Sequence, residues 1–192
     1  MRDYRDALRQ YLEEERKVSE NLPLEDINRV MQVLEQARLS GKRIFICGNG
    51  GSASTASHFA GDFNKGVSYD HGQKQRYDFE CLNDNLPTLL ATANDISYDD
   101  VFVLPLSGKL HEGDVVIGIS GSGNSKNVVR ALDYANQHGG ITVAFTGYDG
   151  GKLKQIAQHN VHVAVDNMQI VEDMHLALDH MMMWVLSEEL KR

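Results

Sequence analysis

The sequence predicts an α/β protein, a three-layer αβα sandwich with a central parallel sheet and a helical N-terminal extension. Short apolar runs alternate along the chain with segments of helical spacing, and this alternation implies crossover connections between parallel strands. Two apolar runs end in turns rich in glycine and serine, CGNGGSAS at 47–54 and GISGSGNS at 118–125. Because ligands of parallel sheets gather beyond the carboxyl ends of strands, both turns are candidate binding sites.

Each element follows from local pattern. Apolar positions at helical spacing predict helices, with Pro23 between the first two, Gly41 closing the second and Asn83-Asp84-Asn85 capping the segment that runs through Ala93. The expected helices are 3–19, 25–39, 53–64, the segment through Ala93, 125–138, a short one from about 150, and 169–190. The expected strands are 43–47, 79–82, 114–119, 141–146 and 160–165. We expect an irregular polar stretch over 65–78.

Composition narrows the class of protein. The chain has 192 residues, 42% of them apolar and 24% charged, which predicts a single domain over 1–192. A net charge of -8 argues against a nucleic-acid partner. The N-terminus lacks the apolar core of a signal peptide and no run could cross a membrane, so we expect a cytoplasmic protein. Cys47 and Cys81 lie in apolar runs, which favours two buried thiols over a redox pair.

The second glycine-serine turn has phosphate-binding chemistry. Ser120, Ser122 and Ser125 offer hydroxyl donors, and the helix expected from Ser125 directs its positive dipole end at the same place. The alternative is that Ser125 only caps its helix and the glycines only turn the chain. The first turn lacks the G-x-G-x-x-G order, and the chain has no P-loop, so neither turn predicts a dinucleotide or nucleoside triphosphate site.

Two helical segments carry a second set of candidates. His58 and Asp62 are four residues apart, so they share one helix face with a spacing suited to a metal. The segment IVEDMHLALDH holds Glu172, Asp173, His175, Asp179 and His180. An isolated helical histidine usually has a structural role, but two separate groups of histidine and carboxylate weaken that interpretation. The adjacent methionines 181–183 and Trp184 are typical of packing in a core or at a subunit interface.

The motifs CGNGGSASTASHFAGDF, LLATANDISYDDVF, EGDVVIGISGSGNSKNVVRAL, FTGYDGGKL and IVEDMHLALDH follow one another as they do in the sedoheptulose 7-phosphate isomerases, also called phosphoheptose isomerases. The chain resembles this family, part of the sugar isomerase (SIS) domain superfamily, over nearly its whole length. The resemblance implies conversion of sedoheptulose 7-phosphate to D-glycero-D-manno-heptose 7-phosphate through an enediol. It also implies a homotetramer with active sites at subunit interfaces, in which residues 1–41 serve oligomerisation.

The resemblance also implies roles for individual residues. The phosphate would be held by Ser120, Gly121, Ser122 and Ser125, with help from Ser52. The sugar would be lined by Asn49, Gly50, Gly51, Asn94 and Asp95. One divalent metal per subunit, zinc in the family, would be held by His58, Asp62, Glu172 and His180. The catalytic residues would be Asp62, His180 and Glu172.

Three positions depart from the family pattern. Asp62 stands where the family has a glutamate that is both metal ligand and base, and Glu172 stands where it has a glutamine ligand. Gly66, beside Lys65, replaces the arginine expected four residues after the catalytic carboxylate. Aspartate is one methylene shorter than the glutamate of the family, so the Asp62 carboxylate would fall short of the position of the base. Two assignments of the base therefore stay open: Glu172, with Asp62 only a metal ligand, or Asp62 itself.

Two other functions fit parts of the pattern. A non-catalytic SIS-family adaptor, like relatives that associate with the bacterial replication initiator, would lack the full set of histidines and carboxylates that this chain retains. A sugar-phosphate-sensing regulator would normally carry a DNA-binding domain, for which we expect 192 residues to leave no room.

Overall fold

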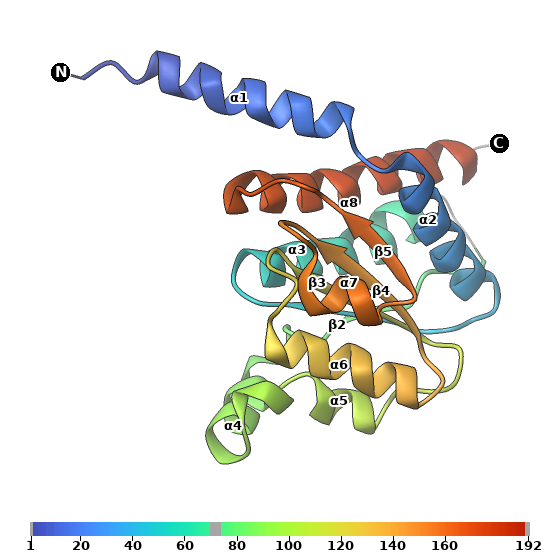
Figure 1. The fold of residues 1–192 in the computed structure, drawn as a ribbon. Helices are drawn as coiled ribbons and strands as arrows, with labels where there is room; N and C mark the ends of the chain where they lie inside the picture. The colour runs from blue at the N-terminus through green and yellow to red at the C-terminus, as the bar shows by residue number, and fades with distance from the viewer. Residues whose placement is uncertain (1, 70–73, 191–192) are drawn as a thin grey trace.

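The computed structural model describes residues 2–69 and 74–190, and its centre is a parallel sheet (Figure 1). The strands are β1 (Ile44–Gly48), β2 (Phe79–Cys81), β3 (Val115–Ser120), β4 (Ile141–Thr146) and β5 (His159–His162). They lie in the order β2-β1-β3-β4-β5, and every neighbouring pair is parallel. The predicted strands are therefore confirmed, with boundaries that agree for β4 and differ by at most three residues for the others.

Helices precede the sheet and connect its strands. They are α1 (Arg5–Glu20), α2 (Leu24–Leu39), α3 (Gly51–Gly61), α4 (Leu86–Asp95), α5 (Val103–Ser107), α6 (Lys126–Gln137), α7 (Gly151–Ile156) and α8 (Met168–Leu190). A π-helix, η1 (Asp62–Tyr69), continues α3, and a 3₁₀ turn, η2 (Tyr98–Asp100), follows α4. Asn85 caps α4 as predicted, since its side chain accepts a hydrogen bond from the Thr88 backbone N–H at 3.2 Å.

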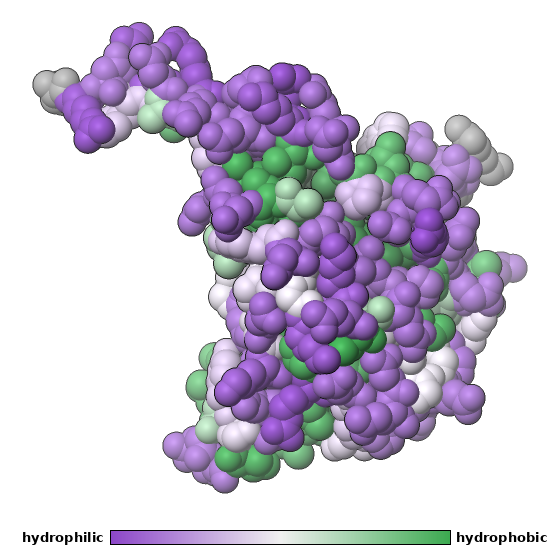
Figure 2. Space-filling model, viewed as in Figure 1, coloured by the Kyte–Doolittle hydropathy of each residue, from purple (hydrophilic) through white to green (hydrophobic). Residues whose placement is uncertain are grey.

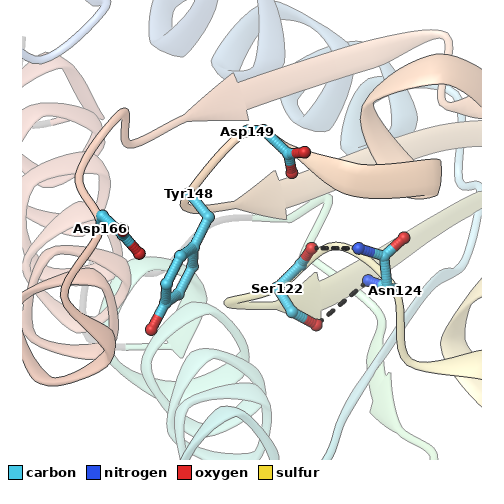
Figure 3. A pocket seen from close by; sticks show the side chains of 5 residues that line it. All are labelled: Ser122, Asn124, Tyr148, Asp149 and Asp166. Carbon is cyan, nitrogen blue, oxygen red and sulfur yellow. Dashed lines mark hydrogen bonds between the residues drawn. The ribbon is translucent and has the colours of Figure 1, made fainter.

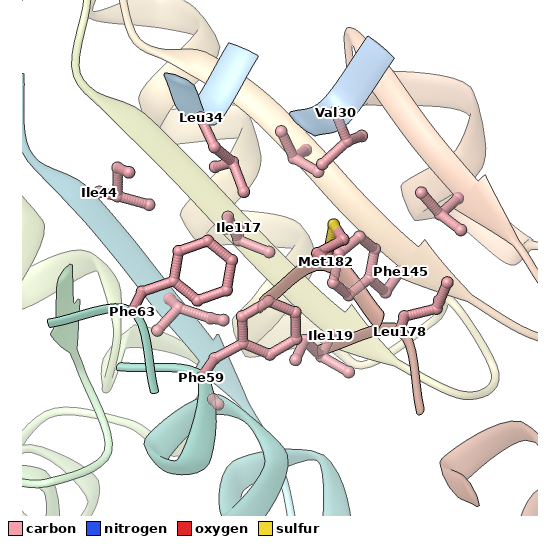
Figure 4. Packing of buried hydrophobic residues seen from close by; sticks show 14 of the residues in the cluster. Val30, Leu34, Ile44, Phe59, Phe63, Ile117, Ile119, Phe145, Leu178 and Met182 are labelled. Carbon is pink, nitrogen blue, oxygen red and sulfur yellow. The ribbon is translucent and has the colours of Figure 1, made fainter. Parts of the chain in front are cut away.

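Two apolar clusters, one on each face of the sheet, confirm the three-layer sandwich. Ile44 and Ile46 of β1 face α2, α3 and α8, whereas Phe45 and Cys47 face α5, α6 and α7. The first cluster packs Phe59 of α3 against Phe145 of β4, with ring centroids 5.6 Å apart (Figure 4). Cys47 and Cys81 are both buried and unpaired, as expected, and burial raises the pKa of the Cys81 thiol to about 12.

Two stretches differ from prediction. Residues 65–69 are helical rather than irregular, because Phe63 and Val67 are four residues apart and both fully buried against the core. Asn64, in the same π-helix, exchanges two hydrogen bonds with the backbone of Phe79: its amide nitrogen donates to the carbonyl oxygen and its amide oxygen accepts from the N–H. The predicted irregular residues 70–73 lie outside the described part. Between Ala93 and Asp114 we assigned no element, and the structure has η2 and α5 there.

Strand pairing brings the two glycine-serine turns together. Gly48 of β1 pairs with Ile119 of β3, so both turns emerge side by side from the carboxyl edge of the sheet. Gly50 and Gly123 have φ angles of +54° and +66°, a region that favours glycine. A Cβ on Gly123 would lie 2.0 Å from the carbonyl oxygen of Gly150, so the close approach of these two loops requires glycine.

The N-terminal helix stands apart from the sandwich. α1 contributes no buried residue and extends away from the body above α8 (Figure 1). Its contact with α8 includes a hydrogen bond that Tyr11 donates to the Asp173 carboxylate. Within residues 2–69 and 74–190, no helix is long and apolar enough to cross a membrane.

Candidate active site

A small cavity of about 110 Å³ lies between the two turns and the start of α8, and we call it the serine cavity. It is lined by Asn49, Ser52, Ile119, Ser120, Gly121, Ser122, Ser125, Met168 and Glu172. The structure therefore unites all four predicted residues of the second turn with Ser52 and Asn49 of the first. Its described lining contains hydroxyl and amide groups and one carboxylate, but no arginine or lysine.

The serine hydroxyls are available to a ligand. Ser125 occupies the position before α6, yet its side chain makes no capping hydrogen bond and instead accepts one from the Ser120 hydroxyl at 3.1 Å. The Ser122 hydroxyl oxygen accepts from the Asn124 backbone N–H at 3.2 Å, which leaves its own proton free to donate. The start of α6 faces the same cavity. These features favour anion binding over the capping alternative.

An amide pair fixes the orientation of Asn49. The side chains of Asn49 and Asn127 exchange two hydrogen bonds, at 2.8 and 2.9 Å, and Asn127 is buried. The Tyr98 hydroxyl also donates to the Asn49 carbonyl oxygen at 2.9 Å. Because the Asn49 amide nitrogen has two hydrogens, one remains for a ligand in the cavity.

Glu172 reaches the serine cavity from the first turn of α8. A Cβ placed on Gly51 would lie 2.3 Å from its carboxylate oxygen Oε2, so this approach depends on glycine at the start of α3. The structure thus places Glu172 beside the first glycine-serine turn. Gly50, Asn94 and Asp95 do not line the serine cavity, although Asn94 donates a hydrogen bond to Asp95 at 2.7 Å at the end of α4.

A wider hollow of about 520 Å³ adjoins the second glycine-serine turn (Figure 3). It is lined by Ser122, Asn124, Tyr148, Asp149 and Asp166. Ser122 belongs to both spaces, so the hollow lies next to the serine cavity. Because two carboxylates line the hollow, an anionic group is better accommodated among the serines.

A second group of side chains gathers where α3 meets α8, and we call it the donor group. One ligand atom from each of His58, Asp62, Asp179 and His180 lies within 4.8 Å of the other three. The Nε2 atoms of His58 and His180 are 3.2 Å apart, and Nε2 of His58 is 3.5 Å from Oδ2 of Asp62. Three of the four predicted metal ligands are therefore together. The fourth, Glu172, is not in this group.

Asp179 takes part in the donor group although it is not among the metal ligands predicted above. Its side chain is fully buried, and neither carboxylate oxygen has a hydrogen-bond partner among the described residues. Burial, and next the negative charge of Asp62, raise the pKa of Asp179 to about 8. A signal existed in the sequence: Asp179 lies one turn after His175 on the buried face of α8 that also carries Leu178 and Met182.

His175 lies deeper in the same helix interface. It is fully buried, and its ring is 6.1 Å from that of Phe145. Neither ring nitrogen makes a hydrogen bond of normal geometry to a described residue. The Thr146 backbone acts to raise the pKa of the ring, but burial has the larger and opposite effect. Burial lowers the pKa of His175 to about 4, so the ring is neutral in the folded protein.

The fold and the position of the serine cavity are typical of one class of protein, the α/β domains that bind a small anionic ligand beyond the carboxyl ends of a parallel sheet. A profile of the SIS domain family matches residues 3–147 of the chain. Among proteins of similar sequence, a probable phosphoheptose isomerase of Thermoplasma acidophilum is 37% identical over 94% of this chain and 98% of its own length. A phosphoheptose isomerase of Akkermansia muciniphila is 33% identical over 86% of both chains.

Solved structures agree with the sequence relatives. A phosphoheptose isomerase from Neisseria gonorrhoeae superimposes with a TM-score of 0.88 and 26% identity, covering 97% of this chain and all of that one. The chain belongs to the SIS domain family and, within it, to the phosphoheptose isomerases.

The buried neutral His175 predicts a pH dependence of stability. In the unfolded chain this histidine takes up a proton near pH 6.5, but in the folded protein only near pH 4. The unfolded state therefore binds more protons in this window, and stability is lost as the pH falls. Its contribution to the free energy of unfolding should fall by about 2 kcal/mol between pH 7 and pH 5.

We expect the free energy of unfolding to fall less between pH 7 and pH 5 in His175→Gln than in the wild type. Both free energies are measured by urea unfolding at one protein concentration. His111→Gln, at an exposed histidine, is the control and should follow the wild type. A His175→Gln curve parallel to the wild type would contradict the assignment.

Proposed function

We propose that this protein is an aldose–ketose isomerase that interconverts sedoheptulose 7-phosphate and D-glycero-D-manno-heptose 7-phosphate. The observation that carries the proposal is that one carboxylate, Glu172, lines the same cavity as the serines suited to a phosphate. The identity to phosphoheptose isomerases over most of the chain supports the choice of substrate.

The serine cavity serves to anchor the substrate. Hydroxyls of Ser120, Ser122 and Ser125 and the start of α6 bind the phosphate without a cationic side chain. Asn49, held by its amide pair, donates to a sugar oxygen. Binding energy from the phosphate, which does not react, orients the carbons that do. Gly50, Gly51, Asn94 and Asp95 remain predicted contacts of the sugar.

Glu172 acts as the base in this proposal. It removes a proton from C1 of the ketose, the electrons form the C1–C2 double bond of a cis-enediol, and the proton returns at C2 to give the aldose. The oxygen on C2 takes up a proton as the enediol forms, and the hydroxyl on C1 gives up its proton as the aldose forms. His180 is the group assigned to these transfers at the two oxygens. Asp62 lies with His58 and His180 in the donor group, which suits a ligand better than the base.

A divalent metal fits the donor group. Two imidazoles and a carboxylate are ligand types that zinc accepts, and the unpartnered buried carboxylate of Asp179 beside them is consistent with a cation. When bound, the metal would polarise the substrate carbonyl and stabilise negative charge on its oxygen. We propose one zinc per subunit, held by His58, Asp62 and His180.

The assembly we propose is a homotetramer with active sites at subunit interfaces. α1 exposes an apolar stripe that includes Leu8 and Leu12, with 62% and 61% of their surface accessible, and Trp184 on α8 is 67% exposed. Apolar residues also gather in the notch between α1 and the body on the face shown in Figure 2. An apolar helix stripe that stays exposed to solvent among the described residues is typical of a subunit contact.

The function is tested by incubating the purified protein with sedoheptulose 7-phosphate and following the aldose by NMR. Glu172→Gln should lower turnover by about 100-fold or more, since general base catalysis contributes about 10²–10⁴-fold. Its thermal stability should change little. Glu112→Gln, at an exposed glutamate before β3, is the matched control and should keep wild-type turnover.

Unchanged turnover in Glu172→Gln would refute its role as the base. If the wild type binds the sugar phosphate and converts none of it, the adaptor alternative is favoured instead.

The phosphate site is tested by Ser122→Ala. Loss of a hydroxyl donor to a charged oxygen should cost about 1.5–3 kcal/mol of binding, so Kd for the sugar phosphate should rise at least tenfold. Stability should hardly move, because the hydroxyl makes a single described hydrogen bond, to the Asn124 backbone. Ser54→Ala, at an exposed serine of α3, is the control in calorimetric titration. A loss of stability with unchanged affinity would mean that Ser122 is a turn residue.

The assembly is tested by light scattering. The wild type should have the mass of four 21.4 kDa chains, and the double variant Leu8→Glu with Leu12→Glu should dissociate, because charges would be buried in the contact. Lys17→Glu introduces the same side chain on the opposite face of α1 and should leave the tetramer intact. A wild-type monomer with full isomerase activity would refute shared active sites.

A further inference from the structure

Two distances within the donor group match those of a tetrahedral metal site. With metal–ligand bonds of about 2.0–2.1 Å, adjacent donors of a tetrahedron are about 3.3 Å apart. The distance from His58 Nε2 to His180 Nε2 is 3.2 Å, and that from His58 Nε2 to Asp62 Oδ2 is 3.5 Å. Two edges of such a site are thus present between side chains of α3, η1 and α8, and a fourth donor remains to be assigned.

Asp179 is the carboxylate that the fold buries at this point. Its exposed fraction is 0%, both of its oxygens lack a described hydrogen-bond partner, and one of them lies within 4.8 Å of the other three donors. An unpaired buried carboxylate beside the Asp62 carboxylate is strongly unfavourable unless a cation or a proton is bound. A divalent ion would satisfy both carboxylates at once.

Glu172 occupies a different place. It precedes His180 by eight residues, which corresponds to about 12 Å of rise along α8. Its carboxylate lies against Gly51 at the start of α3 and lines the serine cavity, whereas the donor group is at the end of α3. The two carboxylates of α8 therefore face different parts of the site.

We propose that Asp179 is the fourth ligand of the metal, with His58, Asp62 and His180, and that Glu172 is not a ligand. This inference rests on the metal of the proposed function and changes one of its ligands from the set that the resemblance implies. Two carboxylates and two neutral imidazoles give a net charge of -2, which a divalent cation neutralises. The exchange also leaves the Glu172 carboxylate free of metal and able to accept a proton.

The test measures metal binding without substrate. Metal-free wild type, Asp179→Asn and Glu172→Gln are titrated with Co²⁺ and with Zn²⁺ against a competing chelator, and the visible spectrum of the Co²⁺ protein reports the ligand set. Circular dichroism of each metal-free variant checks that it is folded. Asparagine keeps the shape of Asp179 and removes its charge, so the metal-free variant should be at least as stable as the wild type.

We expect the wild type and Glu172→Gln to bind one Co²⁺ per chain with the same spectrum. Asp179→Asn should bind both metals more than about 100-fold more weakly, beyond the roughly 10–100-fold that loss of a group behind the ligands causes. Its spectrum should change as well. Wild-type affinity and spectrum in Asp179→Asn, loss of metal in Glu172→Gln, or no metal binding by the wild type would each overturn the inference. The isomerase assay is separate, so failure of the catalytic proposal would be seen independently.

Discussion

The packing of α8 against α3 is the contact on which both parts of the site depend. Phe59 of α3 and Leu178 and Met182 of α8 belong to one fully buried cluster on the sheet. The first turns of the two helices line the serine cavity, and their later turns bring His58 next to His180. A buried apolar interface thereby sets the separation of the serine cavity and the donor group.

That interface also separates the carboxylates by environment. Glu172 approaches the glycine at the start of α3 and faces a cavity of hydroxyl groups, while Asp179 is buried beside a half-buried carboxylate and two exposed histidines. Carboxylates on one helix thus differ in solvation and in neighbouring charge, which are the quantities that decide whether such a group carries a proton, binds a metal or acts as a base.

Much of the fold could be predicted from the sequence because its signals are local. Alternating apolar runs define the strands, and Asn85 and the glycine-serine turns mark where helices begin. The helical conformation of residues 65–69 could not be predicted in this way, because Phe63 and Val67 are held in place by contacts with distant strands and helices rather than by local preference. The short α5 is held in the same way by Leu106 in the second cluster.

The sequence by itself determined the fold class, the second glycine-serine turn as a candidate anion site, and His58 with Asp62 on one helix face, since each depends on residues close together in the chain. Only the tertiary structure decided which carboxylate of α8 joins His58, Asp62 and His180. Helical spacing lists the candidates Glu172, Asp173 and Asp179, but it does not say which of them the packed helix turns toward α3 and which it buries. That selection depends on contacts between segments more than a hundred residues apart, which local sequence patterns do not encode.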